Sequence, residues 1–145
     1  MENHIVQYLQ STLNKPVEGP SPAGNWLKGI VTDASEGDIT VDYIVRPEMC
    51  NPVGTVHGGM LALMIDEVIG IATFSLQTEF LYTTVNLSLD YLSNSRTGET
   101  VTTRATVIRK GKNIINIAAK ITDKSGKILV KASSNLAKTT NKLFN

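Results

Sequence analysis

Hydrophobic residues recur along this chain at two different spacings. Near the N-terminus, Ile5, Leu9 and Leu13 fall about one helical turn apart, which predicts a short amphipathic helix over residues 2–13. Prolines and glycines up to Gly24 then predict an irregular crossing segment. After this segment the spacing changes to every second residue, which is the period of a strand with one buried face.

The alternating runs predict six strands. Ile39, Val41 and Tyr43 have polar neighbours, and the turn at residues 36–38 joins this run to the preceding one as a hairpin. Short charged or glycine-containing turns separate the later runs, so successive strands are expected to lie antiparallel. The predicted strands cover residues 26–33, 39–46, 81–92, 99–109, 113–123 and 127–138.

One long helix, predicted over residues 58–76, stands between the hairpin and the four C-terminal strands. Leu61, Ile65, Val68 and Ala72 form an apolar stripe along it, and such a stripe has to be covered. An antiparallel sheet with one apolar face supplies that cover. The pattern therefore predicts an α+β fold in which a curved antiparallel β-sheet wraps around one central helix.

Composition indicates one globular domain without a strongly charged surface. A chain of 145 residues, 41% of them hydrophobic, is long enough for one core and too short for two. We divide it into an N-terminal helix and crossing segment (1–25), a core (26–138) and a tail (139–145). A net charge of +1 argues against nucleic acid or a membrane surface as the main partner. No apolar run approaches the roughly 20 residues that span a bilayer.

The small number of cysteines and histidines limits the chemistry further. The single Cys50 excludes an internal disulfide and, with no signal-peptide pattern, predicts a reducing cytoplasm. We expect Cys50 to be structural, because only His4 and His57 are available as bases and neither is paired with it in the sequence. One thiol and two distant imidazoles are too few ligands for a metal, so neither a metal nor a separate cofactor is expected.

The segment from Asn51 to Thr73 brings a polar loop, a double glycine and a helical acid into close order. Gly58 and Gly59 precede the helix, so their N–H groups are unpaired donors at the positive end of the helix dipole. Such donors suit a carbonyl oxygen that gains negative charge during attack. Asp66 follows as a carboxylate that can serve as nucleophile or general base.

Gly58 and Asp66 lie too far apart to serve one carbonyl within a single chain. Eight residues of helix separate them by roughly 12 Å, whereas a donor and a nucleophile each approach the reacting atoms to about 3 Å. Two antiparallel copies of the helix remove this difficulty, because the acid of one copy then reaches the glycine of the other. The spacing predicts a two-fold homodimer with two composite sites, and leaves open whether dimers pair into a homotetramer.

Helical spacing also distinguishes Asp66 from its neighbour Glu67. Glu67 lies in a column of bulky side chains, whereas Asp66 belongs to a row of small ones that leaves room for a ligand. The row consists of Gly59, Ala62, Asp66, Gly70 and Thr73. The alternative is that Asp66 is an ordinary solvated residue and the row is a packing groove.

These residues carry a resemblance to a known family. Asn51, Gly54 and the His57-Gly58-Gly59 run, with Asp66 nine residues after the histidine and the strand order given above, resemble the hotdog-fold acyl-CoA thioesterases of the phenylacetate-degradation (PaaI-like) type, within the 4-hydroxybenzoyl-CoA thioesterase superfamily. The likeness covers about residues 26–138. It implies a hotdog fold and hydrolysis of an acyl-CoA to the free acid and CoA, with CoA entering only as part of the substrate.

The resemblance implies a role for each residue of the loop and helix. The Gly58 N–H would polarise the thioester carbonyl, and Asp66 of the facing subunit would attack it or activate water. Asn51 and His57 would orient the thioester and help the leaving thiolate. The residues alone favour the alternatives, an Asn51 that caps its loop and a His57 that bonds to backbone.

A hydroxyl on the strand after the helix is also implied. Thr84 stands eighteen residues after the acid, where relatives often have a serine that positions the attacking water. Thr83 is the competing hydroxyl, and strand propensity is the alternative explanation for both threonines. Strict alternation places Thr84 on the polar side of its strand together with Asn86 and Ser88.

A turn rich in cations is the candidate for holding the phosphates of CoA, because exposed cations suit polyphosphate and glycine permits close backbone approach. The turn consists of Arg109, Lys110, Gly111 and Lys112. Charged hairpin tips are also common simply because they are solvated. On the helix, Gly59 and Leu61 are further candidates for substrate contact, and core packing explains Leu61 as well.

Three other functions are weighed against hydrolysis. The first is a non-hydrolytic acyl-CoA-binding or sensing hotdog dimer, which would need no acid at Asp66. The second is a hydratase or dehydratase, which would pair a histidine with an acid in a different motif. The third is a structural dimer, which leaves the small-residue row unexplained. The residues favour a thioesterase with acyl-CoA as its partner, and they do not identify the acyl group.

Overall fold

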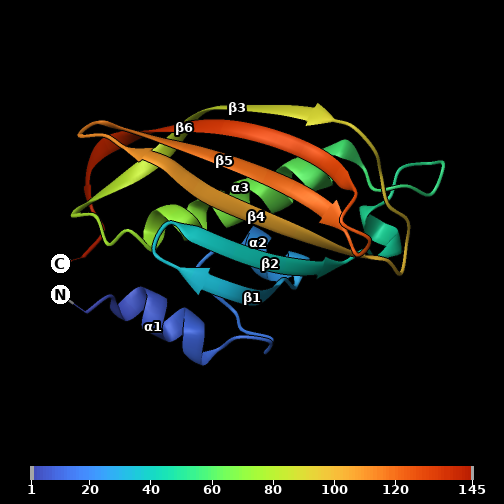
Figure 1. Cartoon of the computed structure of the whole chain (residues 1–145), viewed down its shortest axis with the longest axis horizontal. Coiled ribbons are helices and arrows are strands. Elements are labelled where there is room, and N and C mark those ends of the chain that lie inside the picture. The colour runs from blue at the N-terminus through green and yellow to red at the C-terminus, as the bar shows by residue number, and fades with distance from the viewer. Residues whose placement is uncertain (1, 145) are drawn as a thin grey trace.

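A computed structural model describes residues 2–144 of the chain as one antiparallel sheet wrapped around a long helix (Figure 1). The helical elements are α1 (His4–Ser11), α2 (Pro22–Leu27), the 3-10 turn η1 (Pro47–Met49) and α3 (Gly58–Phe74). The strands are β1 (Ile30–Ser35), β2 (Asp38–Ile44), β3 (Phe80–Tyr91), β4 (Thr100–Lys110), β5 (Ile114–Asp123) and β6 (Ile128–Lys142). Their order in the sheet is β1-β2-β4-β5-β6-β3, and every neighbouring pair is antiparallel.

The core lies between α3 and the concave face of the sheet. The predicted stripe of Leu61, Ile65, Val68 and Ala72 is buried, with at most 1% of any of these residues exposed. Opposite it, the sheet contributes fully buried side chains, among them Ile39, Val101, Ile115, Ile117 and Ile121. The predicted architecture of one helix inside a curved antiparallel sheet is confirmed.

The prediction of a strand beginning at residue 26 is wrong, because a short helix occupies that place. Ser21 caps α2 by accepting a hydrogen bond from the Gly24 N–H, and Pro22 is at the first helical position. The helix ends where Lys28 takes a left-handed conformation with φ 55°. The strand itself therefore starts at Ile30.

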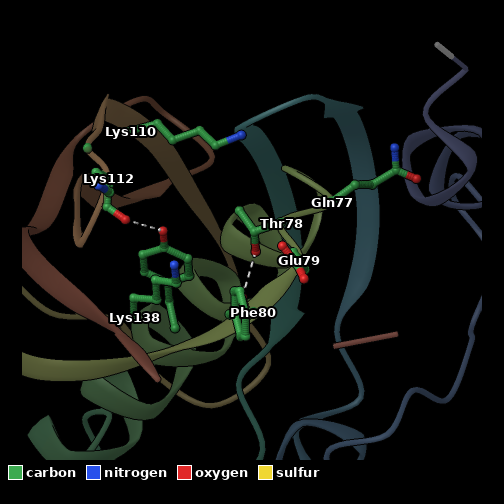
Figure 2. A pocket seen from close by; sticks show the side chains of 9 residues that line it. Gln77, Thr78, Glu79, Phe80, Lys110, Lys112 and Lys138 are labelled. Carbon is green, nitrogen blue, oxygen red and sulfur yellow. Dashed lines mark hydrogen bonds between the residues drawn. The ribbon is translucent and has the colours of Figure 1, made fainter. Parts of the chain in front are cut away.

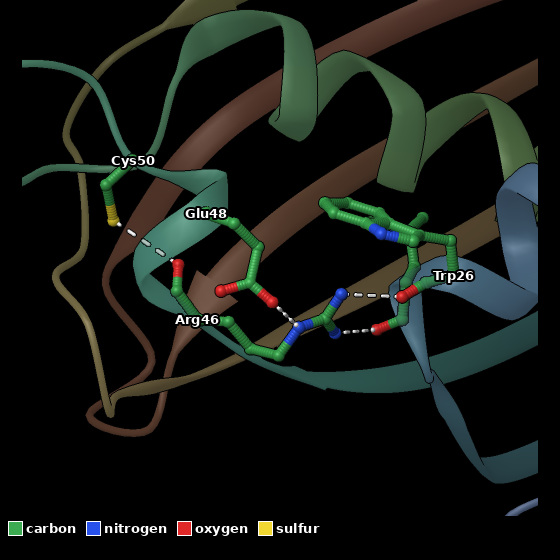
Figure 3. Close-up of polar contacts among 5 residues, drawn as sticks. Trp26, Arg46, Glu48 and Cys50 are labelled. Carbon is green, nitrogen blue, oxygen red and sulfur yellow. Dashed lines mark hydrogen bonds and ion pairs between the residues drawn. The ribbon is translucent and has the colours of Figure 1, made fainter.

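The C-terminal end of α2 is fixed by one arginine from the end of β2 (Figure 3). Arg46 donates to the backbone oxygens of Trp26 and Leu27, at 2.6 and 3.0 Å, and its guanidinium lies 4.7 Å from the centroid of the Trp26 ring. Its Nε also pairs with Glu48, which lowers the pKa of that carboxyl. Arg46 thus satisfies the carbonyls that a helix end leaves unpaired, a contact between distant residues that local spacing does not reveal.

One further boundary, that of the last strand, differs from the prediction. The last strand continues beyond residue 138 to Lys142, and the Phe144 ring then packs on Phe74 at the end of α3, with 5.9 Å between ring centroids. At the other end, the Asn3 side chain donates to the Ser75 carbonyl at 2.7 Å. Both ends of the described chain therefore pack against the C-terminal end of α3. Within residues 2–144 no helix is long and apolar enough to cross a membrane.

Candidate active site

The loop before α3 is closed by its own polar side chains. His57 is the N-cap of α3, and its Nδ1 accepts a hydrogen bond from the Gly59 N–H at 2.9 Å. An imidazole nitrogen that accepts carries no proton, so the proton of the neutral ring is on Nε2. His57 therefore shows the backbone contact that the sequence left as an alternative, while its exposed ring retains one donor for a ligand.

The structure explains why two glycines follow the histidine. A Cβ at Gly59 would lie 3.0 Å from His57 Nδ1, inside the space where the imidazole folds back onto the helix. A Cβ at Gly58 would lie 3.3 Å from the ring of Tyr91, which crosses the start of the helix. The Tyr91 hydroxyl donates to the Gly58 carbonyl at 2.9 Å. Tyr91 is the site residue for which sequence reasoning found no role, because only the fold brings the end of β3 to this turn.

The Gly58 N–H is the free donor of this turn. Met60 and Leu61 donate to the His57 carbonyl and Gly59 donates to the imidazole, whereas the Gly58 N–H has no hydrogen-bond partner within the described chain. It lies in the first turn of a 17-residue helix, where the helix dipole favours negative charge. The Gly58 N–H is therefore available to a ligand, and its role as an oxyanion donor stays a prediction.

The predicted acid and its hydroxyl partner come together on the open side of α3. Asp66 is exposed, and the Thr84 hydroxyl donates to its Oδ1 at 3.2 Å. Thr83 is also exposed but has no contact with Asp66 among residues 2–144, so Thr84 is the threonine that faces the acid. The geometry thus distinguishes two candidates that the sequence left open.

A β-bulge at Val85 puts Thr84 on a different face of β3 from Asn86 and Ser88. The register of β3 against β6 shifts between Thr84 and Asn86, and Val85 is left 57% exposed. Before the bulge Tyr82 packs on the core, and after it Leu87 does. Strict alternation is therefore wrong here: Thr84 faces α3, whereas Asn86 and Ser88 are on the outer side. A bulge adds one residue and reverses the face on which later side chains lie.

The Asn51 side chain makes its hydrogen bonds within its own loop. Its Oδ1 accepts from the N–H groups of Val53 and Thr55, and its Nδ2 donates to the Thr55 hydroxyl at 2.8 Å. These bonds shape the turn that carries His57 and correspond to the capping alternative. In this arrangement the Asn51 amide holds the loop, and the second N–H of its Nδ2, which has no partner among residues 2–144, is available to a ligand.

A second loop, residues 94–99, is hydrogen-bonded to the loop before α3. The Val56 N–H donates to the Ser95 carbonyl at 3.1 Å, and the Asn94 amide donates to the Val56 carbonyl at 3.0 Å. Within this loop the Ser95 hydroxyl and the Arg96 N–H donate to the carboxylate of Glu99, and these bonds lower the pKa of that carboxyl. Glu99 therefore remains charged at neutral pH and keeps the second loop closed.

Glu67 points to a different side of α3 from Asp66, toward α2. Its carboxylate accepts from the Ser21 hydroxyl at 2.7 Å and lies against Gly24, where an added Cβ would overlap it. The buried Tyr43 is close enough for the Glu67 charge to affect it: burial first, and then Glu67, raises the pKa of Tyr43. Glu67 thus joins α2 to α3 and has a structural environment.

The row of small residues is open along most of its length. Gly59, Asp66 and Gly70 are exposed, and a Cβ at Gly70 would meet no atom within 4 Å. Thr73 is the exception, since it is 5% exposed and donates to the Ile69 carbonyl. Leu61 is only 1% exposed, so in a single chain it belongs to the core and is not accessible to a ligand.

Three lysines surround a hollow of about 340 Å³ beside the start of β3 (Figure 2). Lys110, Lys112 and Lys138 line it together with Tyr82 and Phe80, and Lys138 Nζ lies 4.4 Å from the centroid of the Phe80 ring. Part of the predicted cationic turn therefore faces a cavity, and Lys138 joins it from a distant strand.

Two residues of that predicted turn have a different environment. Arg109 is exposed but is not among the residues that line the hollow. Gly111 lines it, but the close approach that requires a glycine is to its own hairpin, because a Cβ there would lie 2.6 Å from the Ile114 carbonyl oxygen. Only the lysines therefore retain the phosphate contact as a prediction.

The remaining reactive side chains form no further cluster. The Cys50 thiol contacts the Arg46 carbonyl at 3.6 Å and the Thr97 hydroxyl at 3.3 Å. Throughout residues 2–144, no group of three His, Cys, Asp or Glu side chains is arranged to hold a metal ion. The polar groups available for chemistry are those of the α3 turn, Asp66 and Thr84.

A long helix wrapped by an antiparallel sheet, with a glycine turn at its start and an acid on its open side, defines the hotdog class of fold. Solved structures agree. The PaaI protein of the Escherichia coli phenylacetic acid degradation operon superposes with a TM-score of 0.83 at 18% identity, covering 97% of each chain. A Streptococcus mutans protein bound to acetyl CoA superposes with a TM-score of 0.74 at 19% identity, covering 85% of this chain and 93% of that one.

Sequence comparison identifies the family. The thioesterase superfamily profile matches residues 53–130, and human acyl-coenzyme A thioesterase 13 is 26% identical over 126 residues, which cover 83% of this chain and 90% of the relative. The chain belongs to the thioesterase superfamily. It is a thioester hydrolase with a hotdog fold, as the resemblance in its sequence implied.

Proposed function

We propose that this protein hydrolyses an acyl-CoA to the free acid and CoA, at sites shared between two copies of the chain. The observation that carries the proposal is the exposed Asp66 carboxylate held by Thr84 on the open face of α3, in a chain of the thioesterase superfamily. Support for CoA as the thiol comes from a similar fold bound to acetyl CoA and from the acyl-coenzyme A thioesterase relative.

The chemistry assigns one task to each polar group. The Gly58 N–H donates to the thioester oxygen, which becomes negative as the carbonyl carbon is attacked. Asp66 either removes a proton from the attacking water or attacks the carbon itself to form an anhydride that water then opens. In both routes the C–S bond breaks and the sulfur leaves as thiolate, which takes up a proton. Thr84 holds the carboxylate or its water, and the His57 Nε2–H is directed to the thioester.

Two copies are needed because Gly58 and Asp66 are eight residues apart on one helix, about 12 Å along its axis. β3 offers the surface for a second copy. It is an edge strand with β6 on one side only, and it exposes Leu81, Val85 and Tyr91 by 42%, 57% and 53%. An uncovered edge of this length is a template for pairing with another chain.

In the proposed dimer the two-fold axis would pass near the middle of both α3 and β3. If Asp66 of one copy meets Gly58 of the other, antiparallel α3 helices cross at the midpoint, Ala62. On β3, Thr84 contacts Asp66 and Tyr91 contacts Gly58, so the corresponding midpoint lies between residues 87 and 88. Ala62 is small and partly exposed, which permits the close approach of two helices at an axis. A symmetric interface of this kind is the commonest form of homo-oligomer.

The lysine-lined hollow is the proposed position of the CoA phosphates. Lys110, Lys112 and Lys138 provide three cations, and Tyr82, which lines the same hollow, precedes Thr84 by two residues on β3. The substrate would then extend along β3 from the hollow to Asp66. The single, partly buried thiol fits a reducing compartment such as the cytoplasm.

Release of free thiol from a panel of acyl-CoA esters tests the proposal. Wild type should release thiol, and Asp66→Asn should lose most of that activity while remaining folded and dimeric. Glu67→Gln is the matched control on the same helix and should retain it. Full activity of Asp66→Asn would remove the role of the acid, and binding without turnover by wild type would favour the sensing dimer.

Hybrid dimers test whether the sites are shared. Subunits carrying Asp66→Asn are mixed with subunits carrying a bulky residue at Gly58, and each parent alone should be inactive. A hybrid has one site with both changes and one site with neither, so it should regain about half of the wild-type activity. No recovery in a demonstrated hybrid would place both groups of a site in one chain.

The phosphate position is tested by comparing two thioesters with the same acyl group. Combined Lys110→Ala and Lys112→Ala should raise KM for the acyl-CoA. The same variant should leave KM unchanged for the acyl ester of N-acetylcysteamine, which has no phosphates. An equal change for both thioesters would exclude the hollow as the phosphate site.

A further inference from the structure

We propose that Tyr91 is a positioning residue that fixes the orientation and tautomer of His57 through the peptide between Gly58 and Gly59. This inference rests on the proposed function and adds a residue to it. Its basis is that both ends of this one peptide group are held: Tyr91 donates to the carbonyl oxygen at 2.9 Å, and the N–H donates to His57 Nδ1 at 2.9 Å.

The two hydrogen bonds are connected through one peptide group, which accepts from Tyr91 and donates to His57. The Tyr91 O–H polarises the Gly58 carbonyl, which makes the N–H of the same peptide a stronger donor to the imidazole. Because Nδ1 accepts, the single proton of neutral His57 is on Nε2, the nitrogen that faces away from the helix. Tyr91 therefore stabilises the tautomer in which His57 presents a donor rather than an acceptor.

No other group holds the imidazole. Among residues 2–144 its only hydrogen bond is the one from the Gly59 N–H, and the ring is otherwise exposed. The position of His57 thus depends on the orientation of a single peptide plane. That plane lies at the start of α3 next to glycines, the residues whose backbone is least restricted. The Gly58 carbonyl also belongs to the helix ladder, and the Tyr91 hydroxyl adds a second hydrogen bond to the same oxygen.

The ring of Tyr91 contributes as well as its hydroxyl. It lies against Gly58, where an added Cβ would meet Cζ at 3.3 Å and Cε1 at 3.4 Å. Tyr91 is nevertheless 53% exposed, so its side chain is not part of the buried core. In the proposed dimer it acts at the site that the acid of the partner copy completes.

The test removes the hydroxyl and keeps the ring. Tyr91→Phe should lower kcat about tenfold, the effect of a barrier increase near that of one lost hydrogen bond. KM should change less than about twofold, because the Tyr91 hydroxyl does not contribute to binding of the substrate in its ground state. Thr139→Val is the control, since the Thr139 hydroxyl also donates to a β3 carbonyl, that of Leu81 at 2.8 Å, but far from Gly58. It should leave both constants unchanged.

Nitrogen-15 NMR of the imidazole gives a readout independent of turnover. In wild type the signals should show the proton on Nε2, and Tyr91→Phe should increase the share of the Nδ1-protonated form and shift the Gly59 amide proton. A wild-type ring protonated on Nδ1 would overturn the inference without any variant. Unchanged kcat in Tyr91→Phe beside an inactive Asp66→Asn would also overturn it, whereas full activity in Asp66→Asn would count against the proposed function alone.

Discussion

Two adjacent carboxylates on α3 have opposite environments. Asp66 is exposed beside a single hydroxyl on the open face, whereas Glu67 accepts from Ser21 and packs on Gly24 beneath α2. The acids differ by one methylene, and a rotation of about 100° around the helix separates them. The side of the helix on which a carboxylate lies therefore decides whether it can meet a substrate or serves to hold the fold together. Variants on the two faces should consequently separate activity from stability.

The largest effect is expected from closing the open face at the proposed axis. Ala62→Trp places a bulky side chain where two helices should meet, so it should yield folded monomers. Activity should fall about a hundredfold or more, because a monomer lacks the oxyanion donor for its acid. Sedimentation and thiol release measure the two results. Ala23→Trp, on the exposed surface of the covered side, should change neither. A fully active Ala62→Trp monomer would contradict the shared site.

A smaller effect on activity is expected at the hydroxyl beside the acid. Thr84→Val keeps the shape of the side chain and removes the hydrogen bond to Asp66. It should lower kcat about tenfold, because a hydrogen bond to a charged group contributes roughly 1.5 kcal/mol. Thr83→Val, one residue away on the outer side, should change kcat less than about twofold. Steady-state kinetics check both variants, and equal losses would mean that strand packing, rather than the contact with Asp66, is responsible.

The open face shows how far sequence reasoning reaches. Local spacing was sufficient for the buried α3 stripe and for the different environments of Asp66 and Glu67, because both depend on the period of a single helix. Alternation failed beyond Thr84, where it placed Asn86 and Ser88 on the same face as Thr84, because the bulge at Val85 depends on pairing with β6. Tyr91 was not predicted at all, because its contact with Gly58 joins residues 33 apart in the chain.

On the side of α3 that α2 covers, called here the covered face, sequence reasoning missed a whole helix. Ser21 and Pro22 carry a helix-start signal, but the surrounding prolines and glycines led to an irregular segment being predicted there. The partners that stabilise α2 are Arg46 and Glu67, which lie 19 to 46 residues away from the atoms they contact. Contacts at such separations arise from tertiary packing, and periodicity contains no information about them.

Variants on the covered face of α3 should change stability rather than activity. Gly24→Ala introduces a methyl group where the Glu67 carboxylate lies, which separates Glu67 from Ser21. Because the carboxylate is the far end of a flexible side chain, Glu67 can move aside, so the free energy of unfolding should fall by about 1 kcal/mol, near the contribution of the lost bond from Ser21, while kcat of the folded protein stays the same. Gly19→Ala is the control, because a Cβ at Gly19 meets nothing within 4 Å. Urea unfolding measures the difference, and an unchanged midpoint for Gly24→Ala would show that the α2 contact does not contribute.

The smallest effect concerns Tyr43, which lies near Glu67. Its ionisation should not change the free energy of unfolding at neutral pH and should lower it only at alkaline pH. Burial, followed by the Glu67 charge, raises the pKa of the Tyr43 phenol in the folded protein. The folded state then retains a proton that the unfolded chain loses near pH 10, so stability is constant below that pH and falls as pH rises above it. For this one group the slope should reach about 1.4 kcal/mol per pH unit. Comparing urea unfolding of wild type and Tyr43→Phe from pH 8 to 11 isolates it: the variant should show a shallower fall above pH 10, whereas parallel curves would mean that Tyr43 ionises equally in both states.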